Sequence, residues 1–296
     1  MTNSPLFSII IPTYNRAGFI RKTIESVLTQ TFQDFEIIVV DDGSTDDTGK
    51  VVKSITSNQL RYLKKENAER GAARNYGSVA ANGLYLAFLD SDDLIYPHHL
   101  STAHEFIKSQ GNPEIFHLGY DIKNEDGTCL KTMGEIKNIN TVILSGNCLS
   151  CNGVFVRKDI MLQNPFNEDR DLASLEDWEL WIRMCARFPF LSANAITSTI
   201  VQHSERSVMG SDTLKIKRKA DRFVQYVLQD EINQRRYGKK LNIAEASAWT
   251  YTALHLAMAK APAGDVLLYL WKGIHSNPME IIKKRFFVIV KKLLGL

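Results

Sequence analysis

The first hundred residues alternate short apolar runs with helical patterns. Four runs rich in β-branched and aromatic residues are typical of strands: Phe7 to Ile11, Phe35 to Val40, Leu60 to Leu63 and Tyr85 to Leu89. The first, second and fourth are apolar enough for burial on both faces of a sheet, whereas the third is more polar and is expected near an edge. Between the first two runs, residues 19–28 place their apolar side chains on one helical stripe. Strands that alternate with helices predict βαβ units and a parallel sheet.

The pattern becomes mixed after about residue 114. We expect a strand over Ile115 to Ile122, a turn at Asp126-Gly127 and a further strand over Val154 to Arg157. Beyond about residue 210, strand patterns stop and helical patterns dominate. The chain therefore predicts an α/β fold with a mixed, mainly parallel central sheet over residues 1–210, followed by a helical C-terminal region over residues 211–296.

Composition adds limits to this picture. The 296 residues are 44% hydrophobic and 23% charged, which is ordinary for a folded globular chain. The net charge of +3 is too balanced to predict nucleic-acid binding. Residues 1–5 lack the charged start and apolar stretch of a signal peptide, and no apolar run approaches the ~20 residues of a membrane span, so we expect a cytoplasmic location.

The four cysteines predict reduced thiols. Cys148-x-x-Cys151 has the spacing of half a zinc site, but neither a second CxxC nor a nearby HxxxH supplies the other half. Buried or half-buried thiols are therefore the favoured interpretation of this pair.

Polar residues follow each of the four predicted strands directly. Ligands of open parallel sheets bind outside the carboxyl ends of the strands, so these residues are expected to face one crevice. Turn formation and helix capping explain Asp and Ser after one strand, but six carboxylates at four strand ends would repel one another unless a cation is bound. The residues in question are Pro12-Thr13-Tyr14-Asn15, Asp41-Asp42-Gly43-Ser44, Glu66-Asn67 and Asp90-Ser91-Asp92-Asp93.

The two carboxylates of Asp90-x-Asp92 follow a buried strand at a spacing that can direct both toward one divalent cation. Mg²⁺ or Mn²⁺ fits an oxygen-rich site, and such an ion would bridge the phosphates of a nucleotide diphosphate and stabilise its departure. The chain lacks both GxxxxGK[ST] and a strand-linked GxGxxG, so the phosphates are not gripped by those loops. Arg74 is the basic residue expected near the donor, with a surface helix position as an equal alternative.

A base for an attacking hydroxyl is offered by Asp177 in Ser174-Leu175-Glu176-Asp177-Trp178. Ser174-x-x-Asp177 also has the pattern of a capping box, and spacing alone slightly favours capping. Trp178, Trp181, Ile182 and Cys185 predict a buried helical stripe in the same segment. His203 follows an apolar strand-like stretch and is a candidate for the metal shell or for phosphate contact, although a single His is more often structural.

Taken together and in order, these segments resemble family 2 glycosyltransferases with the nucleotide-diphospho-sugar transferase fold, called GT-A. The resemblance covers roughly residues 6–205. It rests on the ordered set of segments FSIIIPTYNR, IIVVDDGSTDDT, ENAERGAARNYG, YLAFLDSDD and SLEDWELWIR.

The resemblance implies roles for individual residues. Positions matching Thr13, Tyr14 and Asp42, with neighbouring Asp41, hold the nucleotide base and ribose, uridine being the commonest base. The DxD motif maps onto Asp90 and Asp92, the catalytic aspartate onto Asp177, and a position used beside the metal onto His203. The expected activity is inverting transfer of a sugar, with Asp177 deprotonating the acceptor opposite the departing diphosphate. The full expected set is Asp177 as base; Pro12, Thr13, Tyr14, Asp41, Asp42, Asn67, Arg74, Asp90 and Ser91 at the donor; and Asp90, Asp92 and His203 at Mn²⁺ or Mg²⁺.

The last segment, Ile281 to Leu296, is basic and amphipathic. Such a helix is suited to contact with an anionic inner leaflet. That contact would in turn suit an enzyme that glycosylates a glycan or a lipid-linked acceptor for surface polysaccharide or glycoconjugate. Packing of this helix on its own domain is an equal alternative, and assembly into a homo-oligomer also stays open. Two other functions compete with the main hypothesis: a degenerate sugar-nucleotide-binding scaffold, and a nucleotidyltransferase, whose glycine-rich signature after the first strand is missing here.

Overall fold

A computed structural model describes residues 4–204 and 212–295 and divides the chain into two compact units. Unit 1 comprises residues 1–139, 149–168 and 188–204, and unit 2 comprises residues 140–148, 169–187 and 205–296. Two segments that precede residue 210 therefore group with the C-terminal helices. The boundary predicted between residues 210 and 211 lies outside the described residues and stays a prediction.

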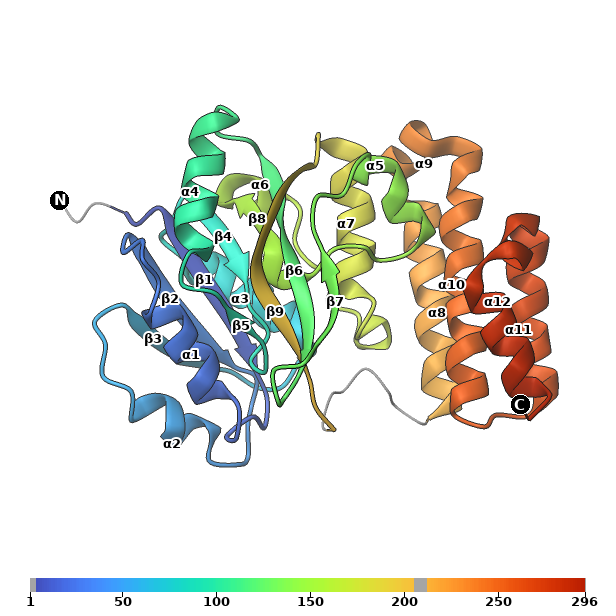
Figure 1. Cartoon of the computed structure of the whole chain (residues 1–296), viewed down its shortest axis with the longest axis horizontal. Coiled ribbons are helices and arrows are strands. Elements are labelled where there is room, and N and C mark those ends of the chain that lie inside the picture. The colour runs from blue at the N-terminus through green and yellow to red at the C-terminus, as the bar shows by residue number, and fades with distance from the viewer. Residues whose placement is uncertain (1–3, 205–211, 296) are drawn as a thin grey trace. The chain divides into compact units, whose positions relative to one another are not determined.

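Unit 1 is built on a mixed sheet (Figure 1). Its order is β3-β2-β1-β4-β8-β6-β9-β5, with β7 paired to β6. The strands of the described chain are β1 (Phe7–Thr13), β2 (Phe35–Asp41), β3 (Leu60–Lys64), β4 (Tyr85–Phe88), β5 (Leu94–Ile95), β6 (Ile115–Asn124), β7 (Cys129–Met133), β8 (Val154–Arg157) and β9 (Leu191–Gln202).

The first four strands are parallel, as their alternation with helices predicts. The polar strand β3 lies at an edge of the sheet, and β1, β2 and β4 are buried along their whole length. The later half is mixed: β8 is antiparallel to β4 and β6, whereas β9 is parallel to β6. The predicted α/β fold with a mixed, mainly parallel sheet is confirmed.

The helices of unit 1 are short and connect the strands. They are α1 (Ile20–Leu28), α2 (Thr48–Lys53), α3 (Glu69–Ala80), α4 (His99–Ser109), the 3-10 turn η2 (Cys151–Gly153) and α6 (Lys158–Gln163). Helix α3 approaches the sheet closely at Gly77, where a Cβ atom would lie 2.5 Å from Ile10 Cγ2 and 3.1 Å from Val40 Cγ2. This contact brings the helix that carries Arg74 against β1 and β2.

Unit 2 is helical in its described residues. Its elements are η1 (Ile143–Ser145), η3 (Arg170–Leu172), α7 (Glu176–Arg187), α8 (Thr213–Gln229), α9 (Glu231–Tyr237), η4 (Gly238–Lys240), α10 (Leu241–Met258), α11 (Ala263–Ser276), η5 (Pro278–Ile282) and α12 (Lys284–Leu293), while α5 (Ile139–Val142) begins at the junction of the two units. Helix α10 packs against α8, α11 and α12. The helical C-terminal region is confirmed.

Helix α7 belongs to unit 2 because its apolar stripe packs on the C-terminal helices. Trp178 stacks on Phe223 of α8 with ring centroids 4.3 Å apart, and Arg187 at the end of α7 pairs with Asp230 at 2.6 Å. Trp181, Ile182 and Cys185 are fully or almost fully buried, as the sequence predicts. The segment that carries Asp177 is thus part of the helical unit.

The C-terminal segment is not one continuous helix. Lys283 is extended between η5 and α12, which divides the predicted helix in two. Ile289 of α12 is buried, and Arg285 donates to the Ser247 carbonyl oxygen and Thr250 Oγ1 of α10 at 2.8 and 3.0 Å. One side of this segment therefore packs on its own unit.

Two further observations concern the described residues as a whole. None of their helices combines the length and apolar character that crossing a membrane requires. The cysteines are free thiols: Cys129 is exposed, Cys148 half-buried, and Cys151 and Cys185 buried. Burial raises the pKa of the Cys148 thiol to about 11.

Buried histidines make the stability of unit 1 depend on pH. Burial lowers the pKa of His99, and that of His117, from 6.5 to about 3. Between pH 3 and 6.5 the two histidines bind protons in the unfolded chain but not in the folded chain. Their contribution to the free energy of unfolding should therefore be greatest above pH 6.5 and decline as the pH falls toward 3.

Urea unfolding between pH 4 and 7 measures this dependence, and near pH 5 we expect the two histidines to add about two protons to the uptake on unfolding. His117→Gln should remove about one of these protons, because a Gln side chain does not titrate. The fold should be kept, since the Gln carbonyl can still accept the Ser150 N–H, which lies 3.3 Å from His117 Nε2. An unchanged slope in this variant would contradict the assignment.

Candidate active site

The carboxyl ends of the parallel strands lie side by side in register. Thr13 at the end of β1 pairs with Asp41 at the end of β2, and Asp41 pairs with Lys64 at the end of β3. The Asp42 N–H continues this pairing by donating to the Thr13 carbonyl at 2.8 Å. The polar residues that follow these strands therefore leave the sheet from one edge, as the sequence predicts.

Asp41 and Asp42 are both buried and both bonded within the chain. Asp41 accepts hydrogen bonds from the Ser44 N–H at 2.7 Å and from the Tyr62 hydroxyl, and burial together with this carboxylate raises the pKa of Tyr62. Asp42 accepts from Lys65 Nζ at 2.7 Å and from the Ala68 N–H at 3.0 Å. These bonds fix the loop after β2.

Other expected donor residues surround this loop. Asn67 donates to the Asp42 carbonyl at 3.0 Å, which ties the loop after β3 to the loop after β2. Pro12 and Thr13 are buried, and Thr13 Oγ1 lacks a hydrogen-bond partner within the described ranges. Tyr14 is 47% exposed, so its ring is open to a ligand.

Arg74 is a buried residue, so the alternative of a surface helix arginine is wrong. Only 1% of Arg74 is exposed, and its guanidinium lies 2.7 Å from Asp90 Oδ1 and 5.1 Å from the centre of the Phe166 ring. Arg74 therefore extends from helix α3 to the loop after β4, where it contacts Asp90. Ser91, next to Asp90, is also buried.

Asp92 and His203 are brought together from residues 111 positions apart. His203 Nε2 lies 3.1 Å from Asp92 Oδ2, and Arg16 Nε lies 3.5 Å from the same oxygen. The His203 ring packs on Phe19 with centroids 4.3 Å apart. One carboxylate oxygen and one imidazole nitrogen are thus in contact at the end of β9.

The contacts of these carboxylates change one step of the sequence argument. Arg74, Arg16 and Lys65 neutralise Asp90, Asp92 and Asp42, so repulsion among the carboxylates does not by itself require a bound cation. Across residues 4–204 and 212–295, no group of three or more His, Cys, Asp or Glu side chains is placed to hold a metal ion. The contact between Asp92 and His203 offers two donor types, carboxylate and imidazole, that fit a divalent cation.

Asp177 lies in the first turn of α7 in unit 2. Its Oδ2 accepts a hydrogen bond from Asn147 Nδ2 at 2.9 Å. The predicted capping box is formed differently, because the Ser174 N–H donates to the Glu176 carboxylate at 2.6 Å rather than to Asp177. Asp177 is therefore not engaged in the reciprocal bond that a capping role assigns to it.

Four residues that position the candidate site were not predicted from the sequence. Asn152 accepts from the Asp90 N–H at 3.1 Å and donates to Asp93 Oδ2 at 2.8 Å, and Asp93 also accepts from the Val201 N–H at 2.9 Å. Polar residues in an otherwise apolar segment, such as those of residues 147–153, were the available signal. The missed residues are Arg16, Lys65, Asn147 and Asn152.

Comparison with models of known families shows to which family this chain belongs. The model of "Glycosyl transferase family 2" matches residues 8–166, more than half of the chain. The chain belongs to glycosyl transferase family 2. The resemblance inferred from the sequence segments is confirmed, and the match includes Asp42 and Asp90 at strand ends and Arg74 in helix α3.

Related proteins agree with this membership. An uncharacterized glycosyltransferase of Rickettsia felis is 32% identical to this family 2 chain over 213 residues, which is 68% of this chain and 35% of the relative. The chain spans about a third of the length of the first curated relatives it matches.

Solved structures share the fold of this family 2 chain. TarS residues 1–349 from S. aureus, in complex with UDP-GlcNAc, superposes with a TM-score of 0.69 at 20% identity, over 98% of this chain and 88% of TarS. The mannosyltransferase PcManGT from Pyrobaculum calidifontis, in complex with GDP-Man and Mn²⁺, superposes with a TM-score of 0.57 at 17% identity, over 99% of this chain and 86% of the other.

The pair of the buried Arg74 and the half-buried Asp90 should matter for stability. We expect Arg74→Ala to lower the free energy of unfolding by about 3 kcal/mol, because it leaves the Asp90 charge without its partner and empties space beside Phe166. Urea unfolding of the whole chain measures this loss.

The exposed Arg21 provides the matched control. Its pair with Glu25 is 3.6 Å apart with both side chains about half exposed, so Arg21→Ala should cost below about 1 kcal/mol. Equal losses in the two variants would show that burial of the Arg74 pair contributes nothing.

Proposed function

We propose that this chain is an inverting glycosyltransferase that moves a sugar from a UDP-sugar to a hydroxyl of a glycan or lipid-linked acceptor, in the assembly of cell-surface polysaccharide or glycoconjugate. The observation that carries the proposal is the match to family 2, whose matched segment includes the polar ends of β1, β2 and β4. Uridine is favoured because the structural neighbour TarS binds UDP-GlcNAc.

In this proposal the loops after the parallel strands bind the donor. Thr13, Tyr14 and Asp42 contact the base and ribose, and Asp41 shapes the loop that presents Asp42. Asn67 ties the neighbouring loop to it. Tyr14 supports this role because its exposed ring can stack on a base. Pro12 and Ser91 line the same edge.

Arg74, Asp90, Asp92 and His203 act at the diphosphate. The guanidinium of Arg74 donates to Asp90 at 2.7 Å, which orients its positive charge before a donor binds. Asp90, Asp92 and His203 would hold Mn²⁺ or Mg²⁺, supported by the contact between Asp92 and His203 and by the Mn²⁺ complex of PcManGT. When bound, such an ion stabilises the negative charge that develops on the departing diphosphate.

Asp177 acts as the base in the proposed reaction. Its carboxylate takes the proton of the acceptor hydroxyl while the hydroxyl oxygen attacks the anomeric carbon, and the bond to the diphosphate breaks on the opposite face. Asn147 donates to Asp177 Oδ2 at 2.9 Å and the Trp178 N–H donates to Oδ1 at 2.7 Å, and these two bonds orient the carboxylate.

The substitution Asp177→Asn tests the base. It should abolish sugar transfer, since an amide cannot take the proton, while metal-dependent UDP binding stays within a few fold of the original chain. Transfer is measured by release of UDP in the presence of acceptor, and binding by calorimetry. Transfer that survives the substitution would refute the assignment of Asp177.

The same experiment separates the competing functions. A degenerate sugar-nucleotide-binding scaffold would bind UDP-sugar without turnover in the original chain as well as in Asp177→Asn. A thermal-shift panel of nucleotide sugars, with and without Mn²⁺, identifies the donor, because at equal concentration the sugar nucleotide that binds most tightly stabilises the folded chain most. Stabilisation by a nucleoside triphosphate and not by any sugar nucleotide would favour nucleotidyl transfer.

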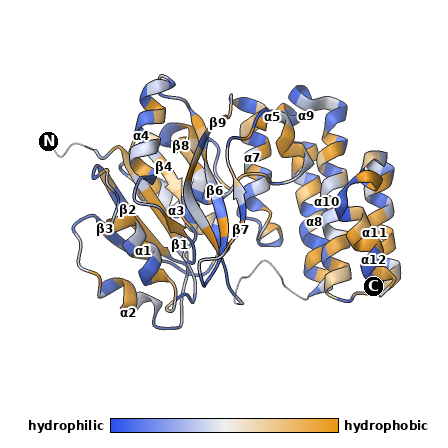
Figure 2. Cartoon of the chain, in the orientation of Figure 1, coloured by the Kyte–Doolittle hydropathy of each residue, from blue (hydrophilic) through white to orange (hydrophobic). Residues whose placement is uncertain are grey.

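We further propose that unit 2 contacts an anionic membrane surface at the inner face through η5 and α12. Ile282 and Phe287 are 68% and 60% exposed, and Lys284, Lys291 and Lys292 are exposed beside them. The neighbouring α11 is also strongly apolar in Figure 2. Exposed apolar side chains flanked by lysines match the interface between acyl chains and anionic headgroups.

Vesicle co-sedimentation tests this contact. The double variant Ile282→Ser/Phe287→Ser should weaken binding to vesicles containing phosphatidylglycerol by about tenfold, since it removes apolar area that would enter the bilayer. Val79→Ser/Leu84→Ser, which changes two exposed apolar residues of unit 1, is the matched control and should bind as the original chain does. Equal loss in both variants, or no binding to these vesicles, would refute the contact.

A further inference from the structure

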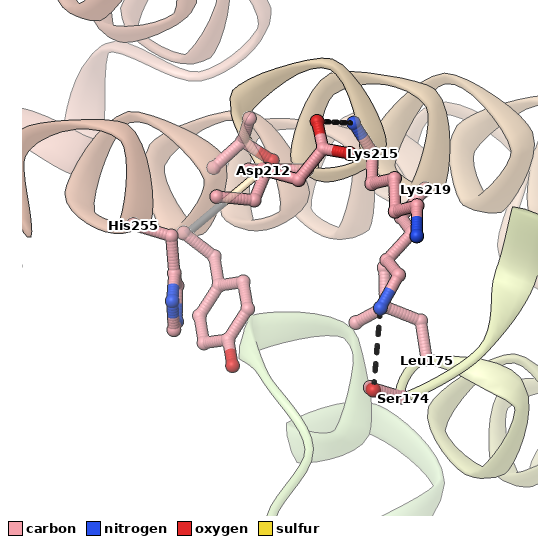
Figure 3. A pocket seen from close by; sticks show the side chains of 9 residues that line it. Ser174, Leu175, Asp212, Lys215, Lys219 and His255 are labelled. Carbon is pink, nitrogen blue, oxygen red and sulfur yellow. Dashed lines mark hydrogen bonds between the residues drawn. The ribbon is translucent and has the colours of Figure 1, made fainter. Parts of the chain in front are cut away.

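Unit 2 contains a cavity beside the start of α7. Figure 3 shows the side chains that line it. They come from three places within the same unit: the residues just before α7, the first turns of α8 and the second half of α10. The residues that matter here are Ser174, Lys215, Lys219, Tyr251 and His255.

The cavity lies close to the candidate base. Ser174 is three residues before Asp177, and the two flank the beginning of α7. Burial raises the pKa of Tyr251 in the cavity wall, and the negative charge of Asp177 raises it further. A molecule in this cavity would contact the turn that leads directly into Asp177.

The charged groups of the cavity are mainly basic. Lys215 is exposed at α8, and Lys219, one turn further, is half-buried with Nζ 3.4 Å from Ser174 Oγ. The acidic side chain in the wall, Asp212, accepts hydrogen bonds from the Leu214 and Lys215 N–H groups at 3.0 and 3.1 Å and so caps α8. Its charge is directed to the helix end.

Two further features increase the positive potential. Lysines in the first turns of a helix add to the positive end of the helix dipole, an arrangement that an anion would compensate. Burial lowers the pKa of His255, and the charges of Arg285 and Lys219 lower it further. His255 is therefore held neutral near pH 7, where its ring can donate one hydrogen bond without adding charge.

We infer that this cavity binds a phosphate group carried by the acceptor, with Lys215 and Lys219 as its cationic partners. Lysine ammonium groups act as point charges toward phosphate, and two of them one helical turn apart match its double negative charge. The phosphate anchors the acceptor so that a neighbouring hydroxyl meets Asp177. The inference rests on the proposed function, because it takes Asp177 to be the base.

Binding of glycerol 3-phosphate to the full chain, measured by calorimetry, tests the inference, with glycerol as the neutral comparison. The full chain should bind glycerol 3-phosphate and not glycerol. The double variant Lys215→Gln/Lys219→Gln should bind it about tenfold more weakly or not at all, because both charge-assisted contacts are lost.

The matched control is Lys239→Gln/Lys240→Gln, which removes two exposed lysines of η4 in the same unit. It should bind glycerol 3-phosphate as the original chain does. Equal weakening in both double variants would mean that net charge alone attracts the phosphate, and this would overturn the assignment. Absence of binding to the original chain would overturn it as well.

Soluble dihexanoyl phosphatidic acid distinguishes two sources of the phosphate. Tighter binding of this lipid than of glycerol 3-phosphate, lost in Lys215→Gln/Lys219→Gln, would support a lipid-borne phosphate. Equal binding of the two would support a polyol phosphate. UDP binding with Mn²⁺ is measured in parallel: if it is retained while phosphate binding fails, the cavity assignment is wrong and the proposed function stands, whereas loss of UDP binding in the original chain defeats the proposed function itself.

Discussion

The structure of unit 1 depends on the neutralisation of carboxylates at the carboxyl edge of its parallel strands. Asp42 lies in the loop after β2, and Asp90 and Asp92 lie in the loop after β4. Each lies beside a basic side chain supplied by another part of the chain. Buried or half-buried carboxylates without such partners would be protonated or would push the loops apart. A donor diphosphate that arrives at this edge meets cations whose charges are already balanced, so it must share Arg74 and Arg16 with the carboxylates.

The proposed chemistry is divided between the two units. The loops of unit 1 carry the residues expected at the donor, whereas Asp177, Asn147 and the lysine-lined cavity belong to unit 2. This division would let substitutions in one unit leave the proposed role of the other unit unchanged. The strand ends proposed to bind a nucleotide are constrained by the register of the sheet. The cavity is formed by helix faces, on which side chains can be exchanged with less effect on the fold.

The strands and helices were predictable to the extent that local pattern determines them. Apolar runs buried on both faces identified β1, β2 and β4, and the polar run identified β3 as an edge. The partners of the carboxylates were not predictable, because Arg74 and Asp90 are 16 residues apart and Asp92 and His203 are 111 apart, and one sequence does not specify such pairs. The break at Lys283 also escaped prediction, since neither Gly nor Pro marks it. The membership of α7 in unit 2 depends on the contact of Trp178 with Phe223, which is likewise a tertiary contact.

That stacking contact has a consequence for the way such chains can be cut and recombined. Because α7 precedes the last strand of unit 1 in the sequence but packs on α8, the helical unit is assembled from chain segments that interrupt the sheet unit. A graft that exchanges only the residues after 210 would leave the indole of Trp178 facing a foreign surface. An exchange of the helical unit between chains of this architecture must therefore carry residues 140–148 and 169–187 along with the C-terminal helices as one inherited module.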